Sequence, residues 1–141
     1  MYFDFTLHLF YVKMLYVNAK YVQNMFIMRS DMKLAIIGSR SIANIEIGKF
    51  IPENVTEIIS GGARGIDSIA REFANKNKIK LTEILPDYKH YGRAAPIIRN
   101  KEIVKLSDKV LAFWNGVSKG TFSVIKYAEE IGVECEVIII N

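Results

Sequence analysis

The sequence has 141 residues, half of them apolar, which is enough for one domain with a substantial core. Its formal net charge is only +4, from 19 basic and 15 acidic residues, and no basic stripe typical of nucleic-acid binders is visible. The single cysteine, Cys135, excludes an internal disulfide, and with two histidines the chain offers no metal-ligand cluster. We therefore expect no metal and, by default, a cytoplasmic protein.

Residues 1–31 differ from the rest of the chain and are treated as an N-terminal extension to a domain over 32–141. They contain eight of the sixteen aromatic residues and neither glycine nor proline, and all five methionines lie at or before Met32. Met32 opens an apolar run of the kind that begins an α/β domain. We hypothesise that Met32 or Met28 is the true start of the protein and that the preceding segment is an artefact of gene calling.

The extension supports no other simple assignment. Charged residues interrupt its apolar run before a membrane span is reached, and no basic segment or small-residue cleavage site marks a signal peptide. Apolar residues from Phe3 to Tyr21 follow a 4-3-4-3-4 spacing typical of a helix, but those from Phe3 to Tyr11 also alternate as in a strand. If the segment is present, we expect an oligomer contact or a surface-lying helix.

From Lys33 onward, short apolar runs alternate with patterns of helical period. We expect strands over 34–37, 55–60, 81–85, 109–114 and 137–140. We expect helices over 66–76, 96–106 and 121–131, with Gly132 as a C-cap and Pro96 in a first turn. A short helix capped by Asn44 and a polar loop over 86–93 complete the chain. This alternation predicts a mostly parallel sheet of about five strands covered by helices on both faces.

Ligands bind where the loops after parallel strands gather, and four loops qualify here: 38–41, 60–67, 86–93 and 114–121. The loop at 60–67 holds three glycines and Arg64 between a buried strand and a helix. Such a turn presents backbone N–H groups and the positive end of a helix to an anion. Its spacing is neither GxGxxG nor a P-loop, and a plain tight turn with a solvated Arg64 is equally compatible.

A second turn carries a faint echo of the first. Ala63-Arg64-Gly65 and Ser118-Lys119-Gly120 share a small–basic–glycine order, and each precedes a predicted helix. Two such turns side by side would hold two ends of one phosphorylated ligand. The match covers three positions, and glycine is common at strand–helix turns.

Five motifs in order give the chain a resemblance to a known family. They are Gly38-Ser39-Arg40, Ser60-Gly61-Gly62-Ala63-Arg64-Gly65-Ile66-Asp67, Tyr91-Gly92-Arg93-Ala94-Ala95, Ile98-Arg99-Asn100 and Phe113-Trp114-Asn115-Gly116-x-Ser118-Lys119-Gly120-Thr121. Over about 33–140 the chain resembles YspA-like (YpsA-related) members of the SLOG superfamily, which includes the LOG phosphoribohydrolases and the DNA-processing protein DprA. The resemblance implies a three-layer Rossmann-like α/β fold, a homo-oligomer with a dimer favoured, and a site for a nucleotide or nucleotide-derived ligand.

The resemblance also assigns roles position by position. The 60–67 turn would hold phosphate or ribose, and Thr121 would place its hydroxyl at the ligand. Arg99 occupies roughly the place of an arginine that LOG enzymes use near the N-glycosidic bond. The LOG catalytic glutamate corresponds to Val124 here, so the resemblance puts LOG-type hydrolysis in doubt; Asp67 or Glu102 would have to substitute.

Each side chain also has a structural interpretation. For Asp67 we slightly favour interaction with the helix dipole over a ribose contact. For Trp114 we favour a core or interface position over stacking on a base, and Tyr91 is similar. We favour ligand contact for Arg40 and Arg64. For Arg93, Arg99, Asn100 and His90, structural and functional interpretations are balanced.

The expected ligand-binding residues are Gly38, Ser39, Arg40, Ser60, Gly61, Gly62, Arg64, Gly65, Asp67, Tyr91, Arg93, Arg99, Asn100, Trp114, Gly116, Ser118, Gly120 and Thr121. The catalytic candidates are Asp67, Arg99 and Glu102.

Two functions from different classes follow. The first is binding or sensing of a nucleotide-derived ligand, with no further cofactor. The second is hydrolysis or transfer at the N-glycosidic bond of a nucleotide, which needs a carboxylate at the ribose. Single-stranded DNA binding is a weaker third idea, and because the net charge is modest we do not expect a nucleic acid or a membrane as a partner.

Overall fold

A computed structural model describes residues 5–141, apart from the side chains of 5–7, 10 and 23–29. Helix α1 (Phe5–Arg29) forms one compact unit and residues 31–141 another. The extension is thus helical, and the strand alternation in its sequence is not realised; Phe3, where both patterns begin, lies outside the described residues. Among the described residues, no helix combines the length and apolar character needed to cross a bilayer.

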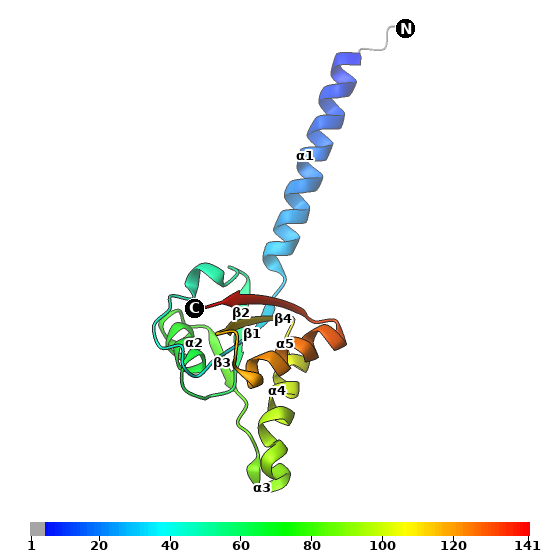
Figure 1. Ribbon diagram of the computed structural model, residues 1–141. Coiled ribbons are helices and arrows are strands. Elements are labelled where there is room, and N and C mark those ends of the chain that lie inside the picture. The colour runs from blue at the N-terminus through cyan, green and yellow to red at the C-terminus, as the bar shows by residue number, and fades with distance from the viewer. Residues whose placement is uncertain (1–4) are drawn as a thin grey trace. The chain divides into compact units, whose positions relative to one another are not determined.

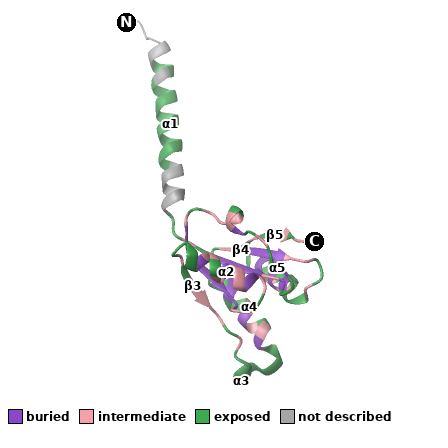
Figure 2. Ribbon diagram, turned by 90° about the vertical axis from the view of Figure 1, so that its left-hand side faces the viewer, coloured by how far each residue is buried: buried purple, intermediate pink, exposed green. Residues whose placement is uncertain are grey.

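The second unit is built on five parallel strands in the order β3-β2-β1-β4-β5. The strands are β1 (Met32–Gly38), β2 (Val55–Ser60), β3 (Lys80–Glu83), β4 (Lys109–Trp114) and β5 (Glu134–Ile139). Most residues of the central strands β1, β2 and β4 are buried, and the centre of the sheet is purple in Figure 2. This confirms the predicted α/β Rossmann-like fold, in which continuous apolar runs mark strands covered on both faces.

Helices cover the two faces of the sheet (Figure 1). Helix α2 (Ile66–Lys76) packs on β1, β2 and β3, whereas α4 (Ala95–Lys105) and α5 (Lys119–Ile131) pack together on the other face. Alternate strand residues divide accordingly: Leu34 and Ile36 face the α2 core, and Ala35 and Ile37 face the α4–α5 core. This period of two is what a strand buried on both sides requires.

Helix α5 ends as its sequence predicts. Gly132 adopts the left-handed conformation (φ 75°), and its N–H donates to the carbonyls of Ala128 and Glu129. The predicted start at Thr121 is two residues late, because Ser118 is the N-cap and the first turn already includes Lys119.

Two predicted connections have a different structure. The segment expected to be a short helix holds only a 3-10 turn (Gly48–Phe50), and its N-cap is Ile47 without a side-chain bond, so Asn44 is not a cap. Ile42 and Ile47 are buried there against the α2 core, and tertiary packing therefore outweighs helix formation in a stretch rich in β-branched residues.

The expected polar loop over 86–93 is partly helical. It contains α3 (Tyr88–Tyr91) and a 3-10 turn (Gly92–Ala94), because Asp87 caps α3 by accepting a hydrogen bond from the His90 N–H at 3.1 Å. Strand β5 begins at Glu134 rather than 137, since Lys109 on β4 pairs with Glu134 and Glu136 at 3.2 and 3.0 Å. Strand β3 spans Lys80–Glu83 rather than 81–85.

Candidate functional site

A pocket of about 440 Å³ opens at the carboxyl edge of the sheet. From β1 the chain proceeds through β2 to β3 on one side, and it then returns to place β4 and β5 on the other. The loops after β1 and β4 therefore leave the sheet in opposite directions, and ligands usually bind between two such loops. The residues that line the pocket are Ile37, Gly38, Ser39, Arg40, Ser41, Gly61, Ala63, Asp67, Pro96, Arg99, Asn100, Ile103, Asn115, Ser118, Gly120, Thr121 and Val124.

The pocket brings together part of the residue set expected from sequence. Those that line it are Gly38, Ser39, Arg40, Gly61, Asp67, Arg99, Asn100, Ser118, Gly120 and Thr121. Those outside its lining are Ser60, Gly62, Arg64, Gly65, Tyr91, Arg93, Glu102, Trp114 and Gly116. The assignment of ligand contacts stays a prediction for both groups.

The glycines after β2 are required by packing within the protein. A Cβ on Gly61 would lie 2.7 Å from Arg99 Nη1 and 2.9 Å from Asp67 Oδ2. Gly65 has φ 78°, and a Cβ there would lie 2.7 Å from the Arg40 carbonyl oxygen. The absent side chains allow the neighbouring loops to approach, so close approach within the fold accounts for these glycines.

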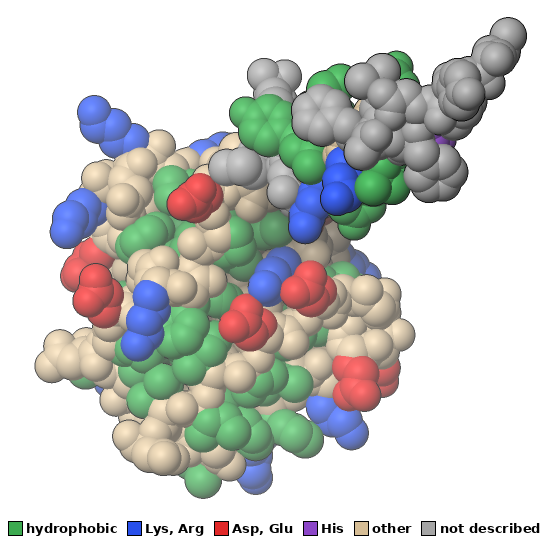
Figure 3. Space-filling view, turned by 90° about the horizontal axis from the view of Figure 1, so that it is seen from above, with side chains coloured by type: hydrophobic (Ala, Val, Ile, Leu, Met, Phe, Trp, Pro, Cys, Tyr) green, Lys and Arg blue, Asp and Glu red, His purple; other side chains and the backbone are tan. Residues whose placement is uncertain are grey.

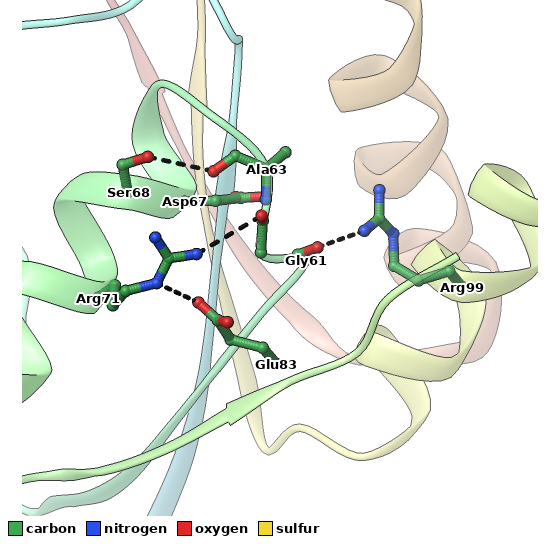
Figure 4. A network of polar contacts seen from close by, with 8 residues as sticks. Gly61, Ala63, Asp67, Ser68, Arg71, Glu83 and Arg99 are labelled. Atoms are coloured by element: carbon green, nitrogen blue, oxygen red, sulfur yellow. Dashed lines mark hydrogen bonds and ion pairs between the residues drawn. The ribbon is translucent and has the colours of Figure 1, made fainter. Parts of the chain in front are cut away.

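The backbone carbonyls of this turn accept hydrogen bonds from side chains within the protein (Figure 4). Arg99 Nη1 donates to the Gly61 carbonyl at 2.6 Å, Arg71 Nη2 to the Gly62 carbonyl at 3.5 Å, and Ser68 Oγ to the Ala63 carbonyl at 3.2 Å. Arg71 is itself fixed by Glu83, with Nε 2.6 Å from Oε1. The turn is therefore a braced part of the scaffold.

Arg99 connects this turn to α4 and to the end of β3. Its side chain is 8% exposed, and Nη1 also donates to the Ile84 carbonyl at 3.2 Å while Nε donates to Asn100 Oδ1 at 2.9 Å. Among the described residues the hydrogen bonds of Arg99 come from Nε and Nη1, and Nη2 points away from Gly61 (Figure 4). Burial lowers the pKa of Arg99 and nearby Asp67 opposes this, and the guanidinium stays charged at neutral pH.

Asp67 is buried beside Arg99, and it braces the same turn. Its Oδ2 accepts a hydrogen bond from the Ala63 N–H at 3.1 Å. Burial raises the pKa of Asp67, although the Ala63 N–H and the Arg99 charge both favour the ionised form. Neither of the two interpretations of Asp67, dipole or ribose contact, anticipated this hydrogen bond within the turn.

The loop after β4 is tied to the loop after β1 by Asn115, which sequence reasoning did not select. Its Oδ1 accepts from the N–H groups of Val117 and Ser118 at 3.1 and 2.8 Å, and its Nδ2 donates to Ser41 Oγ at 3.1 Å. Its own N–H donates to Ser39 Oγ, also at 3.1 Å. An Asn that follows a strand and precedes a glycine is typical of such a turn, so this position in the sequence is the signal that could have identified Asn115.

In the first turn of α5 the space beside the glycine is open, whereas protein atoms fill the space beside the glycines of the turn after β2. Ser118 Oγ caps it by accepting from the Thr121 N–H at 3.4 Å and the Thr121 hydroxyl at 3.2 Å. The N–H groups of Lys119 and Gly120 have no acceptor in the part of the chain that is described. A Cβ on Gly120 would meet nothing within 4 Å, so the fold does not require glycine there.

The remaining predicted residues occupy other surroundings. Arg64, Tyr91, Arg93 and Glu102 are exposed outside the pocket lining. Val124, at the position of the LOG glutamate, lines the pocket and is 3% exposed. Asp67 is therefore the one carboxylate among the described residues that line the pocket.

Charges elsewhere on the unit are mixed. On the face that Figure 3 shows, basic and acidic side chains are interspersed over residues 31–141. In the described part of the chain, no group of three or more His, Cys, Asp and Glu residues is placed to hold a metal ion.

Comparison with known proteins gives a structural likeness. No protein-family model matches the chain, and no curated protein does. The fold is similar to that of DNA processing protein A from Helicobacter pylori, whose structure was described for its single-stranded DNA binding mode. The TM-score is 0.60 at 21% identity, over 81% of this chain and 68% of that one, so what the two chains demonstrably share is the fold.

This likeness corrects one expectation. Nucleic acid was set aside as a partner because the net charge is modest and no basic stripe is visible. A protein of the same fold binds single-stranded DNA, so a small net charge was the wrong ground for excluding that class of partner. Local groups at one edge of a sheet, rather than the total charge, decide whether a phosphate is bound.

Proposed function

We propose that residues 31–141 bind a nucleotide-derived ligand, with its phosphate at the first turn of α5. The observation that carries this proposal is the open Gly120 position in the pocket. Glycine within a helix costs roughly 0.5–1 kcal/mol relative to alanine, and here no atom of the described residues explains that cost. Close approach of a ligand to the Lys119 and Gly120 N–H groups would explain it.

Two guanidinium groups complement this helix end. Arg40 lines the pocket with an exposed side chain, and Arg99 lines it while its hydrogen bonds to the described residues come from Nε and Nη1. Both suit the oxygens of a phosphate, and a single carboxylate, Asp67, opposes them. The ordered motifs further support membership of the YspA-like SLOG proteins, for which we also expect a homodimer.

A binding role fits the pocket better than hydrolysis, because Val124 supplies an apolar side chain where a LOG enzyme has its acid. One observation nevertheless favours hydrolysis as the second candidate. Burial raises the pKa of Asp67, as expected for a proton donor, and this carboxyl group lines the pocket. If the protein releases base from a nucleotide, Asp67→Asn should abolish release while retaining nucleotide binding.

Thermal unfolding of the full chain tests the proposal with AMP, ADP, ADP-ribose, ribose 5-phosphate and an oligodeoxythymidylate. A probe at 100 times its dissociation constant should raise the free energy of unfolding by about 2.7 kcal/mol, and Gly120→Ala should reduce this effect. Arg64→Ala, which changes a charge outside the pocket, is the matched control. No stabilisation by any probe, or equal stabilisation of Gly120→Ala, would contradict the proposal.

The same panel separates a free nucleotide from a nucleotide within DNA. A DNA ligand that contacts several phosphates should lose affinity steeply with salt, whereas a single phosphate contact gives a slope near one. Steep salt dependence with the oligonucleotide and no response to AMP would assign the pocket to single-stranded DNA. Base release, followed by chromatography after incubation with AMP, would identify the hydrolytic alternative.

A further inference from the structure

Phe122, which is absent from the expected site, stands beside the proposed phosphate position. It follows Thr121, a residue that lines the pocket, and its N–H donates to the Ser118 carbonyl at 3.1 Å. The residue is 45% exposed, whereas its neighbour Thr121 and Val124, on the same helix, are buried. Phe122 is not itself part of the pocket lining, and an exposed phenylalanine one residue from that lining calls for an explanation.

One face of the Phe122 ring is held by Trp114. The two rings are stacked, with centroids 5.6 Å apart and an interplanar angle of 26°. Trp114 is fixed in turn, because its indole N–H donates to the Ser118 carbonyl at 3.0 Å. Trp114 thus supports the Phe122 ring, and its assignment as a core or ligand residue stays a prediction.

Besides Trp114, a lysine lies over the Phe122 ring. Lys126 Nζ lies 5.8 Å from the ring centroid, near the outer limit for a cation–π contact, and both residues are exposed. A planar group could take the exposed part of the ring at little cost, and the lysine would add positive charge beside an anionic ligand. Flat rings stack favourably on an aromatic side chain prearranged in this way.

We propose that Phe122 is the stacking platform for the base of the nucleotide whose phosphate binds at Gly120. This inference rests on the proposed function and adds a base-recognition residue to it. The occupant is a nucleobase because Phe122 belongs to the same helical turn as the N–H groups of Lys119 and Gly120. A ligand that spans both must carry a phosphate and a flat ring together. Ribose phosphates without a base are therefore partial ligands.

Calorimetry with AMP and ribose 5-phosphate tests the inference in the full chain. Phe122→Ala should weaken AMP binding by about tenfold and leave ribose 5-phosphate binding unchanged, since only AMP carries a base. Phe122→Tyr retains the ring and should bind AMP like the parent. Ile131→Ala removes another exposed apolar side chain from α5 and should change neither affinity.

Trp114 provides a second readout, because it is the single tryptophan of the chain. Its fluorescence should change with AMP and not with ribose 5-phosphate. Equal weakening of both ligands in Phe122→Ala, or no weakening of either, would overturn the stacking role and leave the phosphate site standing. If neither ligand binds the parent, the proposed function fails, and this inference with it. A Phe122→Ala variant that dissociates a dimer in sedimentation would instead identify the ring as a contact between copies.

Discussion

The two glycine-containing turns at the carboxyl edge of the sheet are alike in sequence and differ in what surrounds their glycines. After β2, Arg99, Asp67 and the Arg40 backbone occupy the space beside Gly61 and Gly65. After β4, the space beside Gly116 and Gly120 is empty to 4 Å. Where protein atoms fill the space beside a glycine, packing explains the absence of a side chain. Where that space is open within a pocket, the close approach of a ligand explains it.

The surroundings of the glycines favour the turn after β4 as the ligand site, whereas the sequence favoured the turn after β2. The sequence favoured the denser glycine cluster as a phosphate loop, and the carbonyls of that turn accept hydrogen bonds from arginine and serine side chains of the protein. N–H groups without an acceptor among the described residues occur in both turns, so the second turn is distinguished by the open space beside Gly120 in the pocket lining. We therefore expect substitutions after β2 to change stability and substitutions after β4 to change ligand binding.

The largest expected effect is at Gly65. Gly65→Ala should lower the free energy of unfolding by at least about 3 kcal/mol, because a Cβ meets the Arg40 backbone and φ is positive. Gly116 has nearly the same φ, 81°, and no neighbour within 4 Å, so Gly116→Ala should cost only about 1 kcal/mol. Urea unfolding measures both. Equal losses would show that backbone strain alone matters and that packing does not distinguish the turns.

Arg99→Lys should follow in magnitude, with a loss of about 2 kcal/mol. A lysine cannot reproduce the bonds from Arg99 to the Gly61 and Ile84 carbonyls and to Asn100 at once. Denaturant unfolding gives the loss, and Lys105→Arg, an exposed change on the same helix, serves as the control. A loss as small as that of the control would mean that the brace on the β2 turn contributes little.

Asp67→Asn should change the pH dependence of stability. Because burial raises the pKa of Asp67 above its ordinary value of 3.8, the folded protein binds this proton more tightly than the unfolded chain does. The stability of the parent relative to the variant should therefore fall as pH rises from 3.8 to the raised pKa, and then level off. Unfolding of both proteins across this range checks the sign, and a relative stability that rises with pH would refute it.

The smallest effect is expected at Arg64, which the sequence favoured as a ligand contact. Its side chain is exposed outside the pocket lining, so Arg64→Ala should change the free energy of unfolding by less than about 0.5 kcal/mol. AMP affinity, measured by calorimetry, should also remain at the parent value. A tenfold loss of AMP affinity would contradict this expectation and show that the turn after β2 contributes to ligand binding.

Sequence patterns predicted the sheet well because its central strands are largely apolar and the long helices of residues 31–141 repeat apolar residues with a helical period. They failed over 86–93, where α3 depends on a single cap from Asp87, and near Asn44, where the burial of Ile42 and Ile47 decides the conformation. Such local outcomes depend on tertiary contacts that a sequence pattern does not contain.

The sequence predicted the edge of the sheet at which the pocket lies better than it predicted which residues line the pocket. Parallel topology brings the loops after β1, β2 and β4 to one edge, whichever residues they hold. Which glycine is filled, however, depends on Arg99 reaching across from α4, and the link between loops depends on Asn115 meeting Ser41. These contacts join residues 38 and 74 positions apart, a separation at which spacing gives no information.

The most direct test of the account is a paired measurement on Gly120→Ala. Alanine should raise the free energy of unfolding by roughly 0.5–1 kcal/mol, because it favours the helix and meets no protein atom. The same change should weaken AMP binding by about tenfold or more, equivalent to about 1.4 kcal/mol, because the methyl group enters the space of the phosphate. A protein that gains stability and loses affinity would support a ligand site at α5. Unchanged AMP affinity would contradict it.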